Sequence, residues 1–202
     1  EPIGEHKFTV VAYDMGIKTN TPRNFAHRGI RTIIVPANTP YADIAAYNPD
    51  GVFVSNGPGD PATADTMVGI VRDILAAKIP FFGICFGNQI LGRALGLNTY
   101  KMKFGHRGIN VPVLNHLTGT IDITSQNHGF ALEGTAGTTF TTPYGDAQVT
   151  HTCLNDGTVE GVALTSGLAY SVQYHPESAA GPHDANPLFD QFVTLMANHK
   201  TH

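Results

Sequence analysis

The chain has 202 residues, a formal net charge of −4 and only 14% charged residues, which suits one α/β domain with a sizeable core. This charge, with no basic run, provides no electrostatic footprint for nucleic acid or an anionic membrane, and no apolar stretch is long enough to span a bilayer. Cys85 and Cys153 are the only cysteines, so we expect a cytoplasmic protein without a disulfide framework.

The first half of the chain alternates between two periodicities. Apolar, β-branched runs predict strands at 8–13, 31–35 and 51–55, and helical spacing predicts helices at 20–28 and 41–47. Asp60 is a predicted N-cap and Pro61 the first residue of a helix that continues over 62–78. An apolar strand follows at 80–84. Alternating strands and helices are typical of a parallel sheet covered on both faces.

After Gly96 the pattern becomes a series of short strands separated by turn signals. The predicted strands are 99–103, 110–114, 120–125, 138–142, 149–154 and 159–164. We interpret them as an antiparallel extension of the same sheet and not as a second domain. A further apolar strand is expected at 169–174. The chain then closes in a helix at 187–199, with one apolar face formed by Leu188, Phe189, Phe192, Val193 and Met196.

Cys85 lies where the strand 80–84 meets a helical pattern, between Gly83 and Gly87. The pattern G-x-C-x-G is the thiol version of the strand–elbow–helix turn that presents nucleophiles. The N-terminus of a helix is expected to lower the pKa of the Cys85 thiol. Gln89 lies one helical turn further on, so its amide can meet a substrate held over Cys85. The alternative is a buried cysteine that only packs in the core.

A nucleophilic cysteine needs a base, and His175 is the best candidate among ten histidines. It directly follows an apolar strand, and Glu177 can accept a hydrogen bond from its ring. His128 is the rival, although the nearest carboxylate in its sequence is Glu133. The remaining candidates have weaker contexts and are interpreted as polar surface or hydrogen-bonded structural residues: His106, His151 and His183.

Backbone N–H groups of Gly57 and Phe86 are candidates for an oxyanion hole, although the segment Gly57-Pro58-Gly59 is equally compatible with a plain turn and helix cap. The segment does not match a dinucleotide-binding fingerprint. No closely spaced set of metal ligands occurs, since His151 with Cys153 supplies only two, so we expect no metal site.

At this point the motifs carry a specific resemblance. The segments 83–89 and 175–177 resemble the Cys–His–Glu glutaminase domain of the class I (triad) glutamine amidotransferases. Within that family, further stretches resemble the small subunits of carbamoyl phosphate synthases: 13–20, 55–61, 101–108, 124–130 and 175–184.

The resemblance implies one class I glutamine amidotransferase domain over residues 1–202, with a flavodoxin-like α/β fold. This fold is a three-layer sandwich with a mostly parallel central sheet and an antiparallel extension. The resemblance assigns Cys85 as nucleophile, His175 as base and Glu177 as its orienting partner. Asn88 stands where many relatives carry His, and we expect it to tune the site. The residues implied to bind L-glutamine are Gly57, Gly59, Phe86, Gln89, Asn127, Gly129 and Phe130.

The implied activity is the glutaminase half of a glutamine-hydrolysing carbamoyl phosphate synthase, a ligase. Ammonia would pass to a large synthetase subunit that binds ATP and uses bicarbonate, so no cofactor is expected in this chain. The sequence lacks an initiator Met and matches nothing of the family's additional N-terminal domain, so we expect a piece of a longer polypeptide, poorly active alone. Two alternatives remain: a free-standing γ-glutamyl hydrolase, and a non-catalytic regulatory subunit, against which the intact Cys85, His175 and Glu177 argue.

Overall fold

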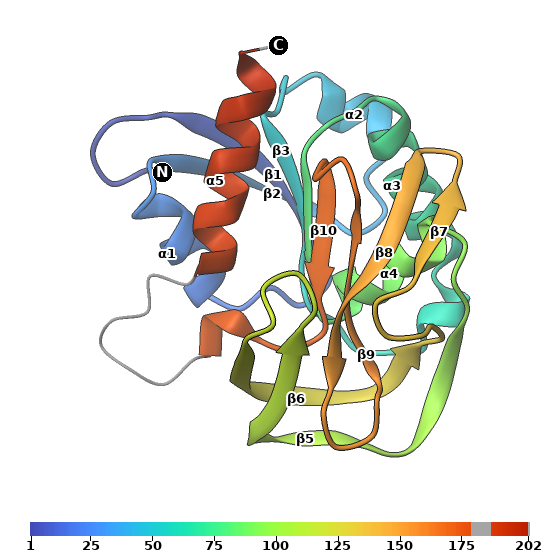
Figure 1. Ribbon diagram of the computed structural model, residues 1–202. Helices are drawn as coiled ribbons and strands as arrows, with labels where there is room; N and C mark the ends of the chain where they lie inside the picture. The colour runs from blue at the N-terminus through green and yellow to red at the C-terminus, as the bar shows by residue number, and fades with distance from the viewer. Residues whose placement is uncertain (179–186, 202) are drawn as a thin grey trace.

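The computed structural model describes residues 1–178 and 187–201. Within them there is one ten-stranded sheet, whose parallel part lies between two layers of helices (Figure 1). The strand order is β2-β1-β3-β4-β10-β9-β8-β5-β6, with β7 paired to β8. The strands are β1 (Phe8–Asp14), β2 (Ile30–Pro36), β3 (Gly51–Val54), β4 (Phe81–Ile84), β5 (Thr99–Asn115), β6 (Ile121–Leu132), β7 (Thr139–Thr142), β8 (Gly145–Cys153), β9 (Val159–Leu164) and β10 (Ala169–Val172). The helices are α1 (Asn20–Ala26), α2 (Tyr41–Ala45), α3 (Asp65–Ala76), α4 (Phe86–Ala94) and α5 (Pro187–Lys200).

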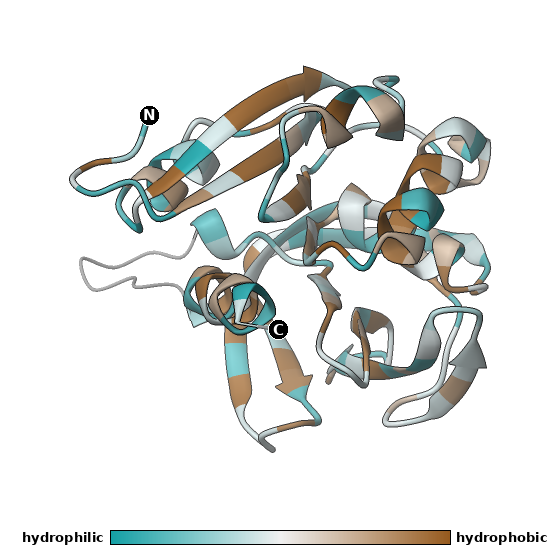
Figure 2. Cartoon of the chain, turned by 90° about the horizontal axis from the view of Figure 1, so that it is seen from above, coloured by the Kyte–Doolittle hydropathy of each residue, from teal (hydrophilic) through white to brown (hydrophobic). Residues whose placement is uncertain are grey.

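The strands β2, β1, β3, β4 and β10 pair in parallel, which confirms the α/β alternation predicted from the sequence. Their side chains alternate between two cores. Val11 and Tyr13 face a core shared with α2, α3 and α4, whereas Val10 and Ala12 face one shared with α1 and α5. Figure 2 shows that apolar and polar residues occur together along the strands and helices. The three-layer architecture is therefore confirmed.

The closing helix α5 packs through the predicted apolar face. Phe189, Phe192 and Met196 are completely buried, and Leu188 and Val193 pack partly buried against the same core. The ring of Phe82 on β4 meets Phe189 edge-on at 5.6 Å between centroids. Burial of large apolar side chains at this density is the main stabilising contribution on this face of the sheet.

The second half of the chain extends the sheet in the antiparallel sense, as predicted, through the pairs β10–β9, β9–β8, β8–β5 and β5–β6. The number and length of its strands differ from the prediction. The strands expected at 99–103 and 110–114 are one 17-residue strand, β5, because Gly105 with φ 68° and a second irregularity are accommodated as bulges. Similarly, β6 continues to Leu132 and includes the segment 126–130 that was expected to follow it.

The helix predicted over 62–78 is also shorter than expected. Asp60 accepts a hydrogen bond from the N–H of Ala62 at 2.9 Å, so it caps a 3₁₀ turn at Pro61–Thr63 instead. The backbone and the hydroxyl of Thr63 both donate to the Asp60 carbonyl, which closes this tighter turn before α3 begins at Asp65. Among the helices of the described residues, none is long and apolar enough to cross a membrane.

Candidate active site

Cys85 forms a strained junction between β4 and α4, which confirms the strand–elbow–helix prediction. Its φ of 57° and ψ of −102° lie in a conformation that non-glycine residues rarely adopt. A side chain at Gly87 would place its Cβ 2.3 Å from the carbonyl oxygen of Val54, and one at Gly83 would lie 2.7 Å from the Gly87 oxygen. The two glycines are therefore required because the backbone of α4 packs directly on its neighbours.

The pKa of the Cys85 thiol is higher than the sequence predicts. Burial raises its pKa to about 12, and the negative charge of Glu177 also raises it, whereas the N–H of Phe86 and the charge of Lys18 lower it. The prediction of a lowered pKa is therefore wrong for this structure, because desolvation of the thiolate outweighs the helix N-terminus. A base close to the sulfur is correspondingly more important.

His175 and Glu177 lie at the carboxyl edge of the strand that neighbours Cys85. The N–H of Cys85 donates to the carbonyl of Val172, the last residue of β10, at 2.8 Å. Three residues later, His175 Nδ1 lies 2.8 Å from Glu177 Oε1, with both side chains buried. Donation from Nδ1 to the carboxylate leaves Nε2 as the basic nitrogen of the neutral ring.

Glu177 is held as a carboxylate in spite of its burial. Desolvation raises its pKa, but the hydrogen bond and charge of His175 outweigh this, and the net pKa lies below the ordinary value. Lys18 Nζ lies 3.4 Å from the same oxygen, Oε1, and contributes in the same direction. The structure thus places, just after the strand that pairs with β4, a histidine whose ring is oriented by a charged partner.

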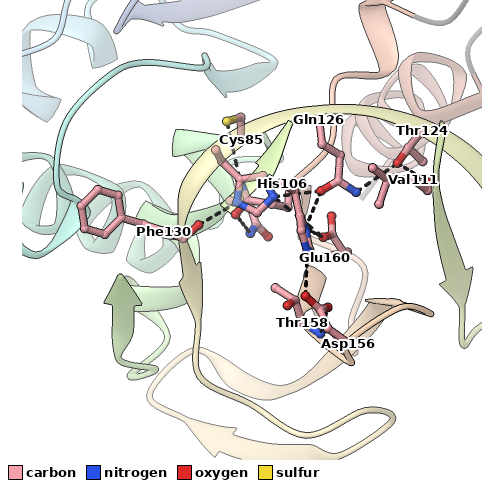
Figure 3. Close-up of polar contacts among 12 residues, drawn as sticks. Cys85, His106, Val111, Thr124, Gln126, Phe130, Asp156, Thr158 and Glu160 are labelled. Atoms are coloured by element: carbon pink, nitrogen blue, oxygen red, sulfur yellow. Dashed lines mark hydrogen bonds and ion pairs between the residues drawn. The ribbon is translucent and has the colours of Figure 1, made fainter. Parts of the chain in front are cut away.

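Gln173 is a further residue at the sulfur, and sequence reasoning assigned it no role. Its Nε2 donates to Cys85 Sγ at 3.5 Å, which is the contact marked by the dashed line at Cys85 in Figure 3. Its Oε1 accepts from Asn88 Nδ2 at 3.2 Å and Gln89 Nε2 at 3.1 Å, so the amide is locked with its N–H toward sulfur. Ser171 in turn donates to Asn88 Oδ1. The signal in the sequence is the position of Gln173, directly after β10 and two residues before His175.

A cavity of about 360 Å³ opens beside Cys85, and we call it the Cys85 cavity. It brings together residues predicted to bind substrate from the loop after β3, from α4 and from β6: Gly57, Gly59, Gln89, Asn127, Gly129 and Phe130. Phe86 is absent from this lining, because its side chain is buried in the core at the start of α4. Gly57 cannot be replaced without movement, since a Cβ there would lie 2.4 Å from the Met15 carbonyl oxygen. The rim also carries three cationic side chains, Lys101, Lys103 and Arg107.

His128, the rival base, lies inside β6 and lines the same cavity. Its Nδ1 lies 2.8 Å from the Phe130 carbonyl oxygen, and burial lowers its pKa to about 4. The carboxylate close to its ring is Glu160 of β9, 3.9 Å from Nε2, and not the expected Glu133. A sequence cannot indicate this partner, because only the tertiary fold brings β9, which pairs with β8 and β10, near β6.

His106 and Glu160 form a second set of perturbed groups behind the cavity. The Glu160 hydrogen bond raises the His106 pKa to about 9, and burial raises the Glu160 pKa to about 7. His151 is buried and bonds to Thr150, as expected of a structural histidine. His183 and the motif residues 179–184 lie outside the described residues.

With this geometry in view, the chain matches the family model for glutamine amidotransferase class I over residues 11–195. The chain belongs to the class I glutamine amidotransferases. It is 83% identical over 200 residues to the carbamoyl phosphate synthase small chain of Corynebacterium diphtheriae, covering 99% of this chain and 53% of that protein. It is 68% identical over 196 residues to the protein of the same name from Mycobacterium tuberculosis, covering 97% of this chain and 52% of the relative.

The chain thus spans about half the length of the curated relatives it matches. Among solved structures it resembles a GMP synthase component from Thermoplasma acidophilum, with a TM-score of 0.78 and 20% identity over 98% of both chains. That likeness shows the fold alone. The family resemblance and the fold predicted from the sequence are therefore confirmed, whereas the individual residue roles stay predictions.

Proposed function

We propose that this chain carries the glutaminase activity of a carbamoyl phosphate synthase, releasing ammonia from L-glutamine for a large synthetase subunit. The observation that carries the proposal is the His175–Glu177 pair, which follows β10, the strand paired with β4 next to the Cys85 elbow. The relatives at 67–83% identity that are named carbamoyl phosphate synthase small chain support it. ATP and bicarbonate are proposed to bind the partner, and the complex is proposed to be cytoplasmic.

In the proposed mechanism the amide carbonyl of glutamine lies over Cys85 in the Cys85 cavity. His175 removes the thiol proton as the sulfur attacks, because a thiol with a raised pKa is not ionised in advance. The N–H groups of Gly57 and Phe86 stabilise the oxyanion. His175 then protonates the departing ammonia.

In the second half of the reaction, His175 takes a proton from water, which hydrolyses the γ-glutamyl thioester to glutamate and restores the thiol. Glu177 orients the ring and stabilises the positive charge that the ring carries after each proton transfer to it. The proposed glutamine-binding groups are those of Gly59, Gln89, Asn127, Gly129 and Phe130 around the cavity.

The test is Cys85→Ser in the complex of the full-length protein with its synthetase subunit. We expect glutamine-dependent carbamoyl phosphate formation to be lost, while synthesis from free ammonia continues. The Cys153→Ser variant is the matched control and should keep both activities, because Cys153 lies on β8 away from the cavity lining. Normal glutamine turnover in Cys85→Ser would overturn the assignment. Turnover of γ-glutamyl peptides that exceeds that of glutamine would favour the free-standing hydrolase.

A further inference from the structure

Four side-chain nitrogen and oxygen atoms that can act as metal ligands lie close together behind the wall of the Cys85 cavity. They belong to residues of β5, β6 and β9 (Figure 3). Gln126 Oε1 lies 2.9 Å from His106 Nδ1 and 2.8 Å from His128 Nε2. Glu160 Oε1 lies 3.1 Å from His106 Nδ1 and 3.9 Å from His128 Nε2. His106 and Glu160 are separated by 54 positions, so no local motif announces this cluster.

The outer nitrogens of both histidines face acceptors. His128 Nδ1 lies 2.8 Å from the Phe130 carbonyl oxygen, and His106 Nε2 lies 2.8 Å from Asp156 Oδ2. Each outer nitrogen must therefore carry the proton that it donates. When the two rings are neutral, as histidines that bind a metal must be, His128 Nε2 and His106 Nδ1 direct lone pairs toward the centre of the cluster.

The amide of Gln126 is oriented independently. Its Nε2 donates to Thr124 Oγ1 at 3.0 Å, and that hydroxyl donates to the Val111 carbonyl at 2.8 Å. The amide oxygen of Gln126 must therefore face the two histidines. If His106 Nδ1 also carried a proton, it could donate to Gln126 Oε1 and Glu160 Oε1. His128 Nε2 and Gln126 Oε1 would still face each other at 2.8 Å as two acceptors with no proton between them.

Glu160 adds a buried carboxylate with one unpartnered oxygen to this group. Its side chain is completely buried, and its Oε2 has no hydrogen-bond partner among the described residues. Buried carboxylates without full pairing are costly unless they are neutralised or coordinate a metal. A cation at the centre of the cluster would satisfy the converging lone pairs and balance this charge.

We propose that His106, His128 and Glu160 bind a divalent transition-metal ion, with the Gln126 carbonyl oxygen as the fourth ligand. Tetrahedral Zn²⁺ at its usual bond lengths separates its ligand atoms by about 3.3–3.4 Å. The four separations given above range from 2.8 to 3.9 Å, on both sides of that value, and the ligand atoms of His106, His128 and Glu160 all lie within 4.8 Å of one another. The outer hydrogen bonds to Asp156 and to a backbone carbonyl are those that typically orient metal-binding histidines.

This site would join β9 to the β5–β6 pair, whose residues 127–130 line the Cys85 cavity. Its role would therefore be structural, and it does not depend on the proposed reaction. Among the described residues, a second set of candidate ligands shares His106 with Cys153 and Asp156. We favour the set of His106, His128, Glu160 and Gln126, because four lone pairs meet there and His128 Nε2 faces Gln126 Oε1 with no proton between them.

The test uses the protein in a Cys85→Ser background, so that the nucleophile's thiol cannot bind metal. After treatment with a chelator, the protein is titrated with Co²⁺ as a spectroscopic probe. We expect saturable 1:1 binding, the intense visible absorption of tetrahedral Co²⁺, and displacement by Zn²⁺. We also expect no sulfur-to-cobalt band. Such a band would show that the metal binds His106, Cys153 and Asp156, and it would overturn the site proposed at His106, His128 and Glu160.

Variants locate the ligands. Glu160→Gln keeps the size of the side chain but removes its charge and one acceptor oxygen, and should weaken Co²⁺ binding by at least about 100-fold, whereas Asp156→Asn should weaken it by roughly 10–100-fold. His116→Asn changes another hydrogen-bonded histidine outside the cluster and should leave the affinity unchanged. Circular dichroism confirms that each variant folds. Absence of 1:1 binding, or equal affinity in Glu160→Gln, would overturn the site and leave a proton-shared hydrogen-bond network in its place.

Discussion

Replacement of Gln173 by Met should make Cys85 markedly less reactive. Gln173 is completely buried, and its N–H is directed at the sulfur because its oxygen accepts from Asn88 and Gln89. Hydrogen bonds to charged groups contribute about 1.5–3 kcal/mol, and one pKa unit corresponds to 1.36 kcal/mol. Loss of this donor should therefore raise the thiol pKa by roughly one to two units, and slow thiolate alkylation about 10- to 100-fold.

The assay is alkylation by iodoacetamide at several pH values, with mass spectrometry to separate Cys85 from Cys153. Cys153 in the same sample is an internal control, whose rate should not change. Ser171→Ala is the matched variant, because it removes a hydrogen bond to Asn88 but leaves the Gln173–Cys85 contact in place. Its effect should remain below about threefold. If the folded Gln173→Met protein were alkylated at Cys85 as fast as the unchanged protein, Gln173 would have no role in supporting the thiolate.

Three further predictions concern the same elements. The alkylation rate of Cys85 should rise about tenfold per pH unit through pH 10, without the plateau near 8.5 of a free thiol, since burial raises its pKa to about 12; a plateau below pH 9 would contradict the role of burial. Glu177→Gln should lower the kcat for glutamine roughly 10²- to 10⁴-fold, measured as ammonia release by the complex, because His175 loses its charged partner; a loss below tenfold would argue against this pairing. Gly87→Ala should lower the thermal stability strongly because its Cβ meets the Val54 oxygen, whereas Gly69→Ala, with open space inside α3, should stabilise by about 0.5–1 kcal/mol; equal melting temperatures would refute the packing argument.

The sequence by itself determined the α/β order, the elbow and the histidine–glutamate pair. These features depend on short-range patterns: an apolar run followed by helical spacing, glycines on both sides of Cys85, and a single proline between His175 and Glu177. Because the carboxyl ends of parallel strands meet at one edge of a sheet, placing Cys85 and His175 after strands was enough to predict their neighbourhood.

Tertiary structure decided what depends on burial and on distant pairing. The helix N-terminus indicated a lowered pKa for Cys85, but the surrounding core reverses the sign, and burial is a property of the whole fold. Similarly, β5 and β6 continue as long strands because each pairs with the other. Glu160 became a neighbour of His106 and His128 only because the folded sheet brings β9 close to the β5–β6 pair, although β9 itself pairs with β8 and β10. Contacts between residues so distant in the chain leave no periodic signal in the sequence.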